Sequence, residues 1–145
     1  MSLNAAAHLV VAPVLLPMLA AAVLMVLPDR LRGLKAALNL VAMLASLGLA
    51  LWLFAGLDLV TPRALAVYLP GNWPVPYGIV LALDRLSAMM LVLSALVALG
   101  ALLFSLARWH RASVHFHPLL QLQLMGLNGA FLTADLFNLF VFFEV

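Results

Sequence analysis

Short polar stretches divide this chain into long runs of hydrophobic residues. Four segments contain no Asp, Glu, Lys or Arg: residues 5–27, 36–57, 86–107 and 115–134. A membrane-spanning helix needs about 20 apolar residues, each adding about 1.5 Å of length. The second and third runs are therefore roughly 33 Å long. The apolar part of the fourth, residues 118–134, is shorter at about 26 Å, which is still enough for a span.

The pattern predicts an all-α integral membrane fold over residues 1–145. We expect four transmembrane helices and the incomplete start of a fifth, at about residues 8–28, 36–57, 79–107, 117–134 and 135–145. A loop at about 58–78 joins the second and third helices. The first run follows no Lys or Arg and precedes no clear cleavage site, so we interpret it as a retained span and not as a signal peptide.

Composition agrees with the pattern and excludes several classes of protein. Hydrophobic residues make up 68% of the chain and charged residues 8%, which is more apolar surface than a soluble domain of this length can bury. The absence of cysteine excludes disulfides and thiolate metal sites within these residues. The net charge of +2 gives no basic patch for nucleic acid, so the partner indicated by composition is the lipid bilayer.

The basic residues predict an orientation in the membrane. The first and third loops together carry most of them: Arg30, Arg32, Lys35, Arg108 and Arg111. The second loop holds only Arg63, with Arg85 at the start of the next helix. Since cytoplasmic loops are enriched in Lys and Arg, we expect the first and third loops in the cytoplasm and the N-terminus in the periplasm.

The second loop is richer in structure signals than a plain connector. Pro70, Gly71 and Asn72 form a turn signal, and residues 67–69 and 79–83 on either side of it are able to pair as a hairpin. Tyr68, Trp73 and Tyr77 fit anchoring at the lipid headgroups. The alternative is a specific contact with a partner protein.

Glu144 is the acid that the apolar pattern explains least. If the fifth helix begins near Asp135, Glu144 lies roughly 13.5 Å further along, near the middle of a hydrocarbon core about 30 Å thick. It shares a helix face with Phe137 and Phe140. A carboxylate at that depth is costly unless it is paired, hydrated or protonated, which favours a proton-carrying role. The alternative is a structural acid paired with a basic residue outside these 145 residues.

Other polar residues at the ends and along one face of the spans allow two interpretations each. Gln121, Asn128 and Asp135 are spaced seven apart, so they could line a water path or hydrogen-bond neighbouring helices. Asp135, with Asn138 three residues later, also fits a helix N-cap. Asp84 fits an N-cap of the third span, or an ion pair with Arg85 at the mouth of a pathway.

Three histidines gather in the third loop: His110, His115 and His117. Histidine titrates near cytoplasmic pH, so the cluster could collect protons, although a solvated loop is the simpler interpretation. A His-x-His pair could ligate metal, but no third ligand lies nearby in the sequence. We therefore expect no metal, and no motif indicates a cofactor.

Two blocks of the chain resemble a known family. HPLLQLQLMGLNGAFLTADLFNLFVFFEV, residues 117–145, resembles the D-type membrane protein of the multisubunit Mrp-type cation/proton antiporters, and GNWPVPYGIVLALDRLSAMMLVL, residues 71–93, looks like the second loop and third span of the same family. The stretch DLFNLFVFFE, residues 135–144, also resembles the antiporter-like membrane subunits of respiratory complex I.

The resemblance implies a role for individual residues. Glu144 matches the proton-handling glutamate of the family's fifth transmembrane helix, Asp135 the acid at the preceding turn, and Asp84 the acid that opens the third span. Family members have about fourteen helices with two inverted five-helix repeats, and their central lysines lie on later helices. We therefore expect an incomplete sequence, because a helix that ends in the bilayer leaves its last carbonyls unsatisfied.

The function implied by the resemblance is that of the N-terminal portion of a proton-translocating subunit in a multisubunit Na⁺ or K⁺/H⁺ antiporter of a bacterial inner membrane. Its partners would be sister subunits, protons and a monovalent cation, and it would act as a secondary transporter. The alternative is a membrane-arm subunit of an NADH:quinone oxidoreductase or a membrane-bound hydrogenase. A third hypothesis is a scaffold without activity.

Overall fold

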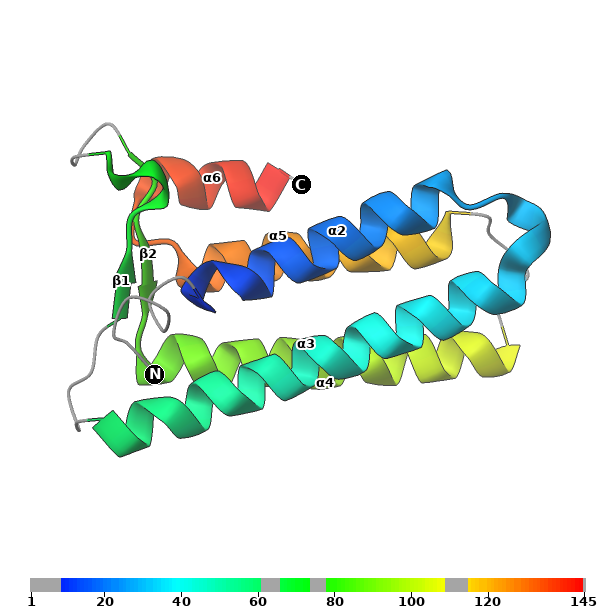
Figure 1. The fold of residues 1–145 in the computed structure, drawn as a ribbon, viewed down its shortest axis with the longest axis horizontal. Helices are drawn as coiled ribbons and strands as arrows, with labels where there is room; N and C mark the ends of the chain where they lie inside the picture. Colours follow the sequence, from blue (N-terminus) through cyan, green and yellow to red (C-terminus); the bar gives the residue numbers. More distant parts are fainter. Residues whose placement is uncertain (1–8, 61–65, 74–77, 109–114, 145) are drawn as a thin grey trace.

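The computed structural model describes residues 9–60, 66–73, 78–108 and 115–144, and most of them are helical (Figure 1). The helices are α2 (Ala12–Val26), α3 (Arg32–Val60), α4 (Arg85–Arg108), α5 (Phe116–Leu132) and α6 (Leu136–Glu144). Short helical turns are η1 (Leu9–Val11), η2 (Asp29–Leu31) and η3 (Pro70–Asn72), and the two strands are β1 (Ala66–Tyr68) and β2 (Leu81–Leu83).

Helices α2 to α5 lie side by side along the long axis of the molecule (Figure 1). α2 packs mainly against α5, α3 packs mainly against α4, and contacts of α2 with α3 and of α4 with α5 complete the bundle. The hairpin and the turn before α6 lie at one end, whereas η2 and the beginning of α5 lie at the other (Figure 1). We call these the hairpin end and the η2 end.

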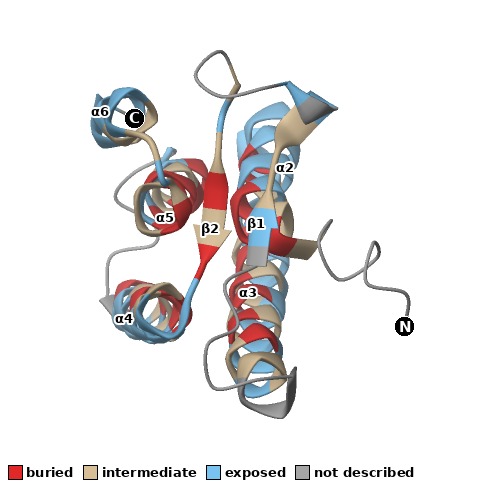
Figure 2. Cartoon of the chain, turned by 90° about the vertical axis from the view of Figure 1, so that its left-hand side faces the viewer, coloured by how far each residue is buried: buried red, intermediate tan, exposed pale blue. Residues whose placement is uncertain are grey.

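The outward faces of the bundle are apolar. Figure 2 shows the buried residues gathered on the facing sides of the helices and the exposed residues around the outside. Many of the exposed side chains are large hydrophobic ones, such as Leu19, Val41 and Phe104. Within the described residues, three segments are long and apolar enough to cross a membrane, namely Leu9–Val26, Asp29–Leu57 and Arg85–Ala107. The chain is a multi-pass membrane protein with its apolar outer faces suited to lipid.

The expected hairpin is present. β1 and β2 pair antiparallel, with Tyr68 opposite Leu81. Gly71 has a φ of 72°, a left-handed conformation that suits glycine in the turn between the strands. β2 also continues toward the turn before α6, because the N–H of Ala134 donates to the carbonyl of Val80 at 2.9 Å. These pairings take up the backbone of the residues just before α4.

The third span is shorter than the sequence suggested. The expected range of 79–107 includes β2, and the helix itself begins only at Arg85. Hydrophobicity alone does not separate a short buried strand from the first turns of a helix. Here the pairing of β2 with β1 and the N-cap at Asp84 fix the boundary.

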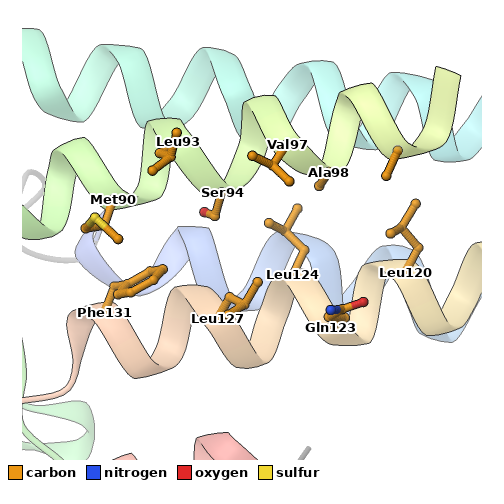
Figure 3. Close-up of a pocket in the computed structure, with 11 residues that line it drawn as sticks. Met90, Leu93, Ser94, Val97, Ala98, Leu120, Gln123, Leu124, Leu127 and Phe131 are labelled. Atoms are coloured by element: carbon orange, nitrogen blue, oxygen red, sulfur yellow. The ribbon is translucent and has the colours of Figure 1, made fainter. Parts of the chain in front are cut away.

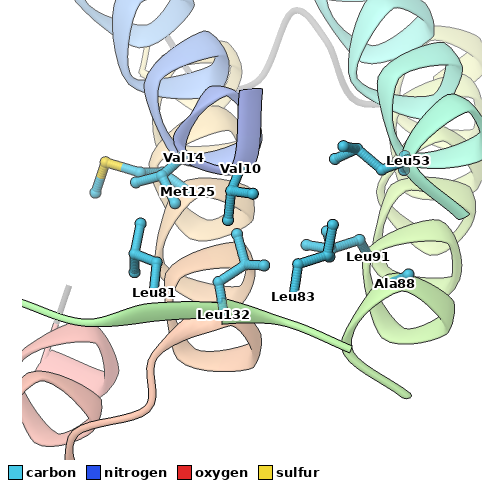
Figure 4. Close-up of a cluster of buried hydrophobic side chains, with 10 residues drawn as sticks. Val10, Val14, Leu53, Leu81, Leu83, Ala88, Leu91, Met125 and Leu132 are labelled. Atoms are coloured by element: carbon cyan, nitrogen blue, oxygen red, sulfur yellow. The ribbon is translucent and has the colours of Figure 1, made fainter. Parts of the chain in front are cut away.

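The hairpin closes the bundle over a hydrophobic cluster. Leu81 and Leu83 of β2 point toward the helices and are almost completely buried (Figure 4). Their neighbours come from α4, α5 and the start of the chain, including Leu91, Leu132 and Val10 (Figure 4). The two buried leucines of β2 therefore connect helices that are distant in the sequence.

Candidate functional site

The described residues place their buried polar side chains at two levels of the bundle, and α6 carries a third set at its two ends. Asn128 lies within the bundle among α2, α4 and α5. Asn39, His117 and Gln121 join α3 to α5 near the η2 end. Asp135 and Glu144 lie at the beginning and the end of α6.

Asn128 compensates for a break in the hydrogen bonding of α2. Pro17 lies inside α2, and proline has no N–H to donate to the carbonyl four residues earlier, which is that of Pro13. The Nδ2 of Asn128 donates to the oxygen of Pro13 at 2.8 Å. On its other side, Oδ1 of Asn128 accepts from the hydroxyl of Ser94 at 3.0 Å. Both ends of the Asn128 amide are thus used to hold α2 and α4 against α5.

Asn39 is the centre of a buried hydrogen-bonded chain between α3 and α5. Its Oδ1 accepts from Nε2 of Gln121 at 2.7 Å, and its Nδ2 lies 2.9 Å from Nδ1 of His117. Asn39 and Gln121 are fully buried, and His117 is 3% exposed. His117 is therefore a buried residue of the first turn of α5, not part of a solvated loop.

Lys35 lies one helical turn before Asn39 and is 4% exposed. Its Nζ donates to Oδ1 of Asp29 in η2 at 2.9 Å, and Asp29 itself is exposed. A buried ammonium requires such a partner because desolvation of an unpaired charge is costly. The sequence analysis used Lys35 only to assign orientation and did not consider Asn39. The spacing of four between them, in an otherwise apolar helix, was the signal for a buried polar face.

Asp135 caps α6. Its Oδ1 accepts from the N–H of Phe137 at 3.2 Å, and its Oδ2 accepts from Nδ2 of Asn138 at 2.8 Å. Both bonds are those of an N-cap, one of the two interpretations that the sequence allowed. Asp135 is half-buried.

Asp84 caps α4 in the same way. Its Oδ1 accepts from the N–H of Ser87 at 2.6 Å. The hydrogen bonds from the backbone and side chain of Ser87 lower the pKa of this exposed carboxyl below its usual range. Asp84 is therefore an ionised capping residue at the hairpin end of the bundle.

Glu144 is the last residue of α6 and is exposed. Within the described residues it has neither a hydrogen bond nor an ion pair. Phe137 and Phe140, which the helical spacing places on the same face as Glu144, are also exposed. Phe142, on the other side of α6, packs against Gly129 of α5. The face of α6 that carries Glu144 is thus turned away from α5.

The remaining histidines of the predicted proton-collecting loop divide between described and undescribed residues. His115 is exposed at the N-cap of α5. His110 lies outside the described residues. Among the residues that are described, no three His, Asp or Glu side chains come together as metal ligands.

A groove of about 270 Å³ runs between α4 and α5 (Figure 3). Its lining is apolar apart from Ser94 and Gln123. The Ser94 hydroxyl is within hydrogen-bonding distance of both Asn128 and the carbonyl of Leu91. The groove therefore offers an apolar surface for lipid or another helix, and its chemistry does not suit an ion.

No profile of a known protein family matches the chain. A probable K(+)/H(+) antiporter protein of the D type from Rhizobium meliloti is 51% identical over 140 residues, which are 95% of this chain and 26% of that protein. The chain is a homologue of the D-type antiporter proteins. The D-type protein of a Na(+)/H(+) antiporter from Alkalihalophilus pseudofirmus is 35% identical over 140 residues, 95% of this chain and 28% of that protein.

Two further similarities extend the relationship of this antiporter homologue. The N-type protein of an NADH-quinone oxidoreductase from Desulforudis audaxviator is 39% identical over 82 residues, 54% of this chain and 16% of that protein. A chain in the solved structure of an Mrp complex from a Dietzia species has a TM-score of 0.83 at 30% identity, over 98% of this chain and 26% of that one. The antiporter homologue spans about a quarter of the length of the D-type proteins that it matches.

Proposed function

We propose that this chain is the N-terminal portion of a proton-translocating subunit in a multisubunit Na⁺ or K⁺/H⁺ antiporter. The observation that carries the proposal is the 51% identity to a D-type antiporter protein over 95% of the chain. The fold match to an Mrp complex chain supports it. The partners would be sister subunits of the complex, and the transported species would be protons and a monovalent cation.

The membrane arrangement that we propose has four spans and the beginning of a fifth in a bacterial inner membrane. α2, α3 and α4 provide three spans by length and composition. α5 has 17 residues and lies within the same bundle, so it would be the fourth, and α6 would begin the fifth. The excess of Arg and Lys in the first and third loops supports a periplasmic N-terminus, with the η2 end in the cytoplasm.

Glu144 is the residue that we propose takes up and releases the proton. α6 carries it about 13.5 Å along the helix from Asp135, on the face that is turned away from α5. The surroundings of this carboxyl would be supplied by helices outside these residues. Asp135, Asp84 and Asn128 have hydrogen bonds that explain them as structural residues, which leaves Glu144 as the acid on α6 without a structural partner in the described part of the chain.

The test is Glu144→Gln in the full-length protein, assembled in its complex. Gln keeps the size and polarity of the side chain but does not ionise in the working pH range. We expect cation-dependent proton exchange in inside-out vesicles to fall by about 10²-fold or more, because the proton-transfer group is lost. The matched control is Glu144→Asp, which keeps an ionisable group and should retain part of the exchange. Undiminished exchange in Glu144→Gln, with normal assembly, would contradict the assignment.

The second candidate is a membrane-arm subunit of an NADH:quinone oxidoreductase. The similarity to the N-type protein of such an enzyme favours it, although this covers only 54% of the chain. Deletion of the gene separates the two functions. Loss of growth at high Na⁺ or K⁺ and alkaline pH supports the antiporter, whereas loss of NADH oxidation by membranes supports the oxidoreductase.

A further inference from the structure

The hydrogen bonds between α3 and α5 define the orientation of two buried amides. Nε2 of Gln121 donates to Oδ1 of Asn39, so Nδ2 of Asn39 faces His117. Nδ2 has only hydrogens to offer, so Nδ1 of His117 must act as the acceptor. This arrangement fits a neutral imidazole whose proton is on Nε2.

Oε1 of Gln121 has no hydrogen-bond donor within the described residues, although the side chain is fully buried. Leaving a buried carbonyl oxygen without a donor costs about 1–3 kcal/mol relative to a satisfied one. This acceptor gains a donor if both amides rotate by half a turn. Nδ2 of Asn39 would then donate to Oε1 of Gln121, and Oδ1 of Asn39 would face His117.

The rotated arrangement is the one that a doubly protonated His117 requires. An imidazolium carries a hydrogen on Nδ1 and needs an acceptor there, which Oδ1 of Asn39 would supply. We propose that His117 is a buried proton-binding site, and that the amides of Asn39 and Gln121 rotate together to stabilise either of its two protonation states. The proton would come from water at the η2 end and bind to Nδ1.

The charged groups around this site oppose and support the added proton. On α3, Lys35 and Arg32 are positive and disfavour a second cation, while Asp29 in η2 is paired with Lys35. On α5 the neighbouring titratable residue is His115, and α4 ends at this side of the bundle with Arg108. α2, the remaining element packed on α5, has no charged residue. Asp29 is thus the group that offsets the positive charge.

This site is separate from Glu144, which lies on α6, and its occupancy is measurable without transport. The full-length protein in its complex, reconstituted in lipid with isotope-labelled histidine nitrogens, would be studied by solid-state NMR. The His117 signal is the one that His117→Gln removes. We expect Nε2–H with a bare Nδ1 at high pH, and hydrogens on both nitrogens at low pH. A Nδ1–H tautomer, or a single proton throughout about pH 5–9, would overturn the proposal.

Two substitutions at one position test whether the amides are coupled to the proton. Gln121→Glu presents only acceptors to Asn39, which holds Nδ2 toward residue 121 and Oδ1 toward His117. We expect a larger doubly protonated fraction at a fixed pH. Gln121→Met has a similar length but no acceptor, and we expect a smaller fraction. Equal fractions in the two variants would overturn the coupling.

Two further variants cover the remaining ambiguities. The carboxylate of Gln121→Glu also attracts the proton directly, so the same substitution is repeated with Asn39→Leu. Without the Asn39 amide, the effect of Gln121→Glu should be smaller, and an unchanged effect would contradict rotation of Asn39. If His117→Gln does not assemble, the His117 signal is the histidine signal that changes between Gln121→Glu and Gln121→Met. No changing signal would also contradict the proposal.

Discussion

At the scale of single residues, the polar side chains of this apolar bundle differ in how fully their neighbours explain them. Asn128, Asp84 and Asp135 each complete the hydrogen bonding of a backbone segment. His117 is engaged with Asn39 in a buried contact, and Glu144 has no partner among the described residues. Titratable groups that local structure does not require are the better candidates for proton chemistry.

Asn128 and Pro17 should be energetically coupled. Asn128→Leu leaves the Pro13 carbonyl and the Ser94 hydroxyl without their partner and should destabilise the full-length protein by about 1 kcal/mol. In a Pro17→Ala background, the restored N–H of residue 17 can bond to the Pro13 carbonyl, so Asn128→Leu should cost less. A double-mutant cycle on unfolding in detergent micelles measures this coupling. Simple additivity of the two substitutions would show that the Pro13 bond has no net value.

At the scale of elements, α6 depends on close contact with α5. Gly129 has no side chain, and Phe142 occupies the space where a Cβ would lie. The bulk of the remaining side chains on α6 is exposed, so this contact and the Asp135 cap position the short helix. The location of Glu144 thus depends on a glycine in the preceding helix.

Gly129→Ala should therefore displace α6. The added methyl group would overlap the ring of Phe142, and we expect weaker α5–α6 packing and a loss of exchange in the full-length complex. Gly100→Ala is the matched control, because a Cβ at Gly100 meets nothing within 4 Å and alanine favours helix. The measurements are thermal stability and proton exchange for both variants. Equal behaviour of Gly129→Ala and Gly100→Ala would mean that the Phe142 contact does not position α6.

At the scale of the whole molecule, the bundle has two chemically different ends. The hairpin end has exposed Trp73 beside a compact turn, and the η2 end has exposed Arg30 and the Lys35–Asp29 pair. Apolar outer faces connect them (Figure 2). The proposed orientation places the η2 end, and with it the His117 site, on the cytoplasmic side.

The orientation is testable with single cysteines, since these 145 residues contain none. Trp73→Cys and Arg30→Cys would be made in a full-length protein whose other cysteines, if present, are replaced. We expect an impermeant thiol reagent added to intact spheroplasts to label Trp73→Cys only. Arg30→Cys should react once the membrane is permeabilised. The reverse pattern would invert the topology and place His117 on the outer side.

The sequence by itself determined the elements whose causes are local. Long apolar runs specify membrane helices because lipid offers the backbone no hydrogen bonds. Pro70 and Gly71 specify the turn of the hairpin, and Asp84 and Asp135 are recognisable caps. Residue spacing also placed Phe137, Phe140 and Glu144 on one face, although it does not tell which face is covered.

Only the tertiary structure decided which distant residues meet. Asn39 lies 78 positions from His117, and Asn128 lies 115 from Pro13, so no spacing rule relates them. The start of α4 at Arg85 depends on β2 pairing with β1, and the need for glycine at position 129 depends on where Phe142 packs. Hydrophobic patterning sets which segments are buried in lipid, whereas the partners of buried polar groups are set by how the helices pack, because each such group must find a hydrogen bond across the bundle.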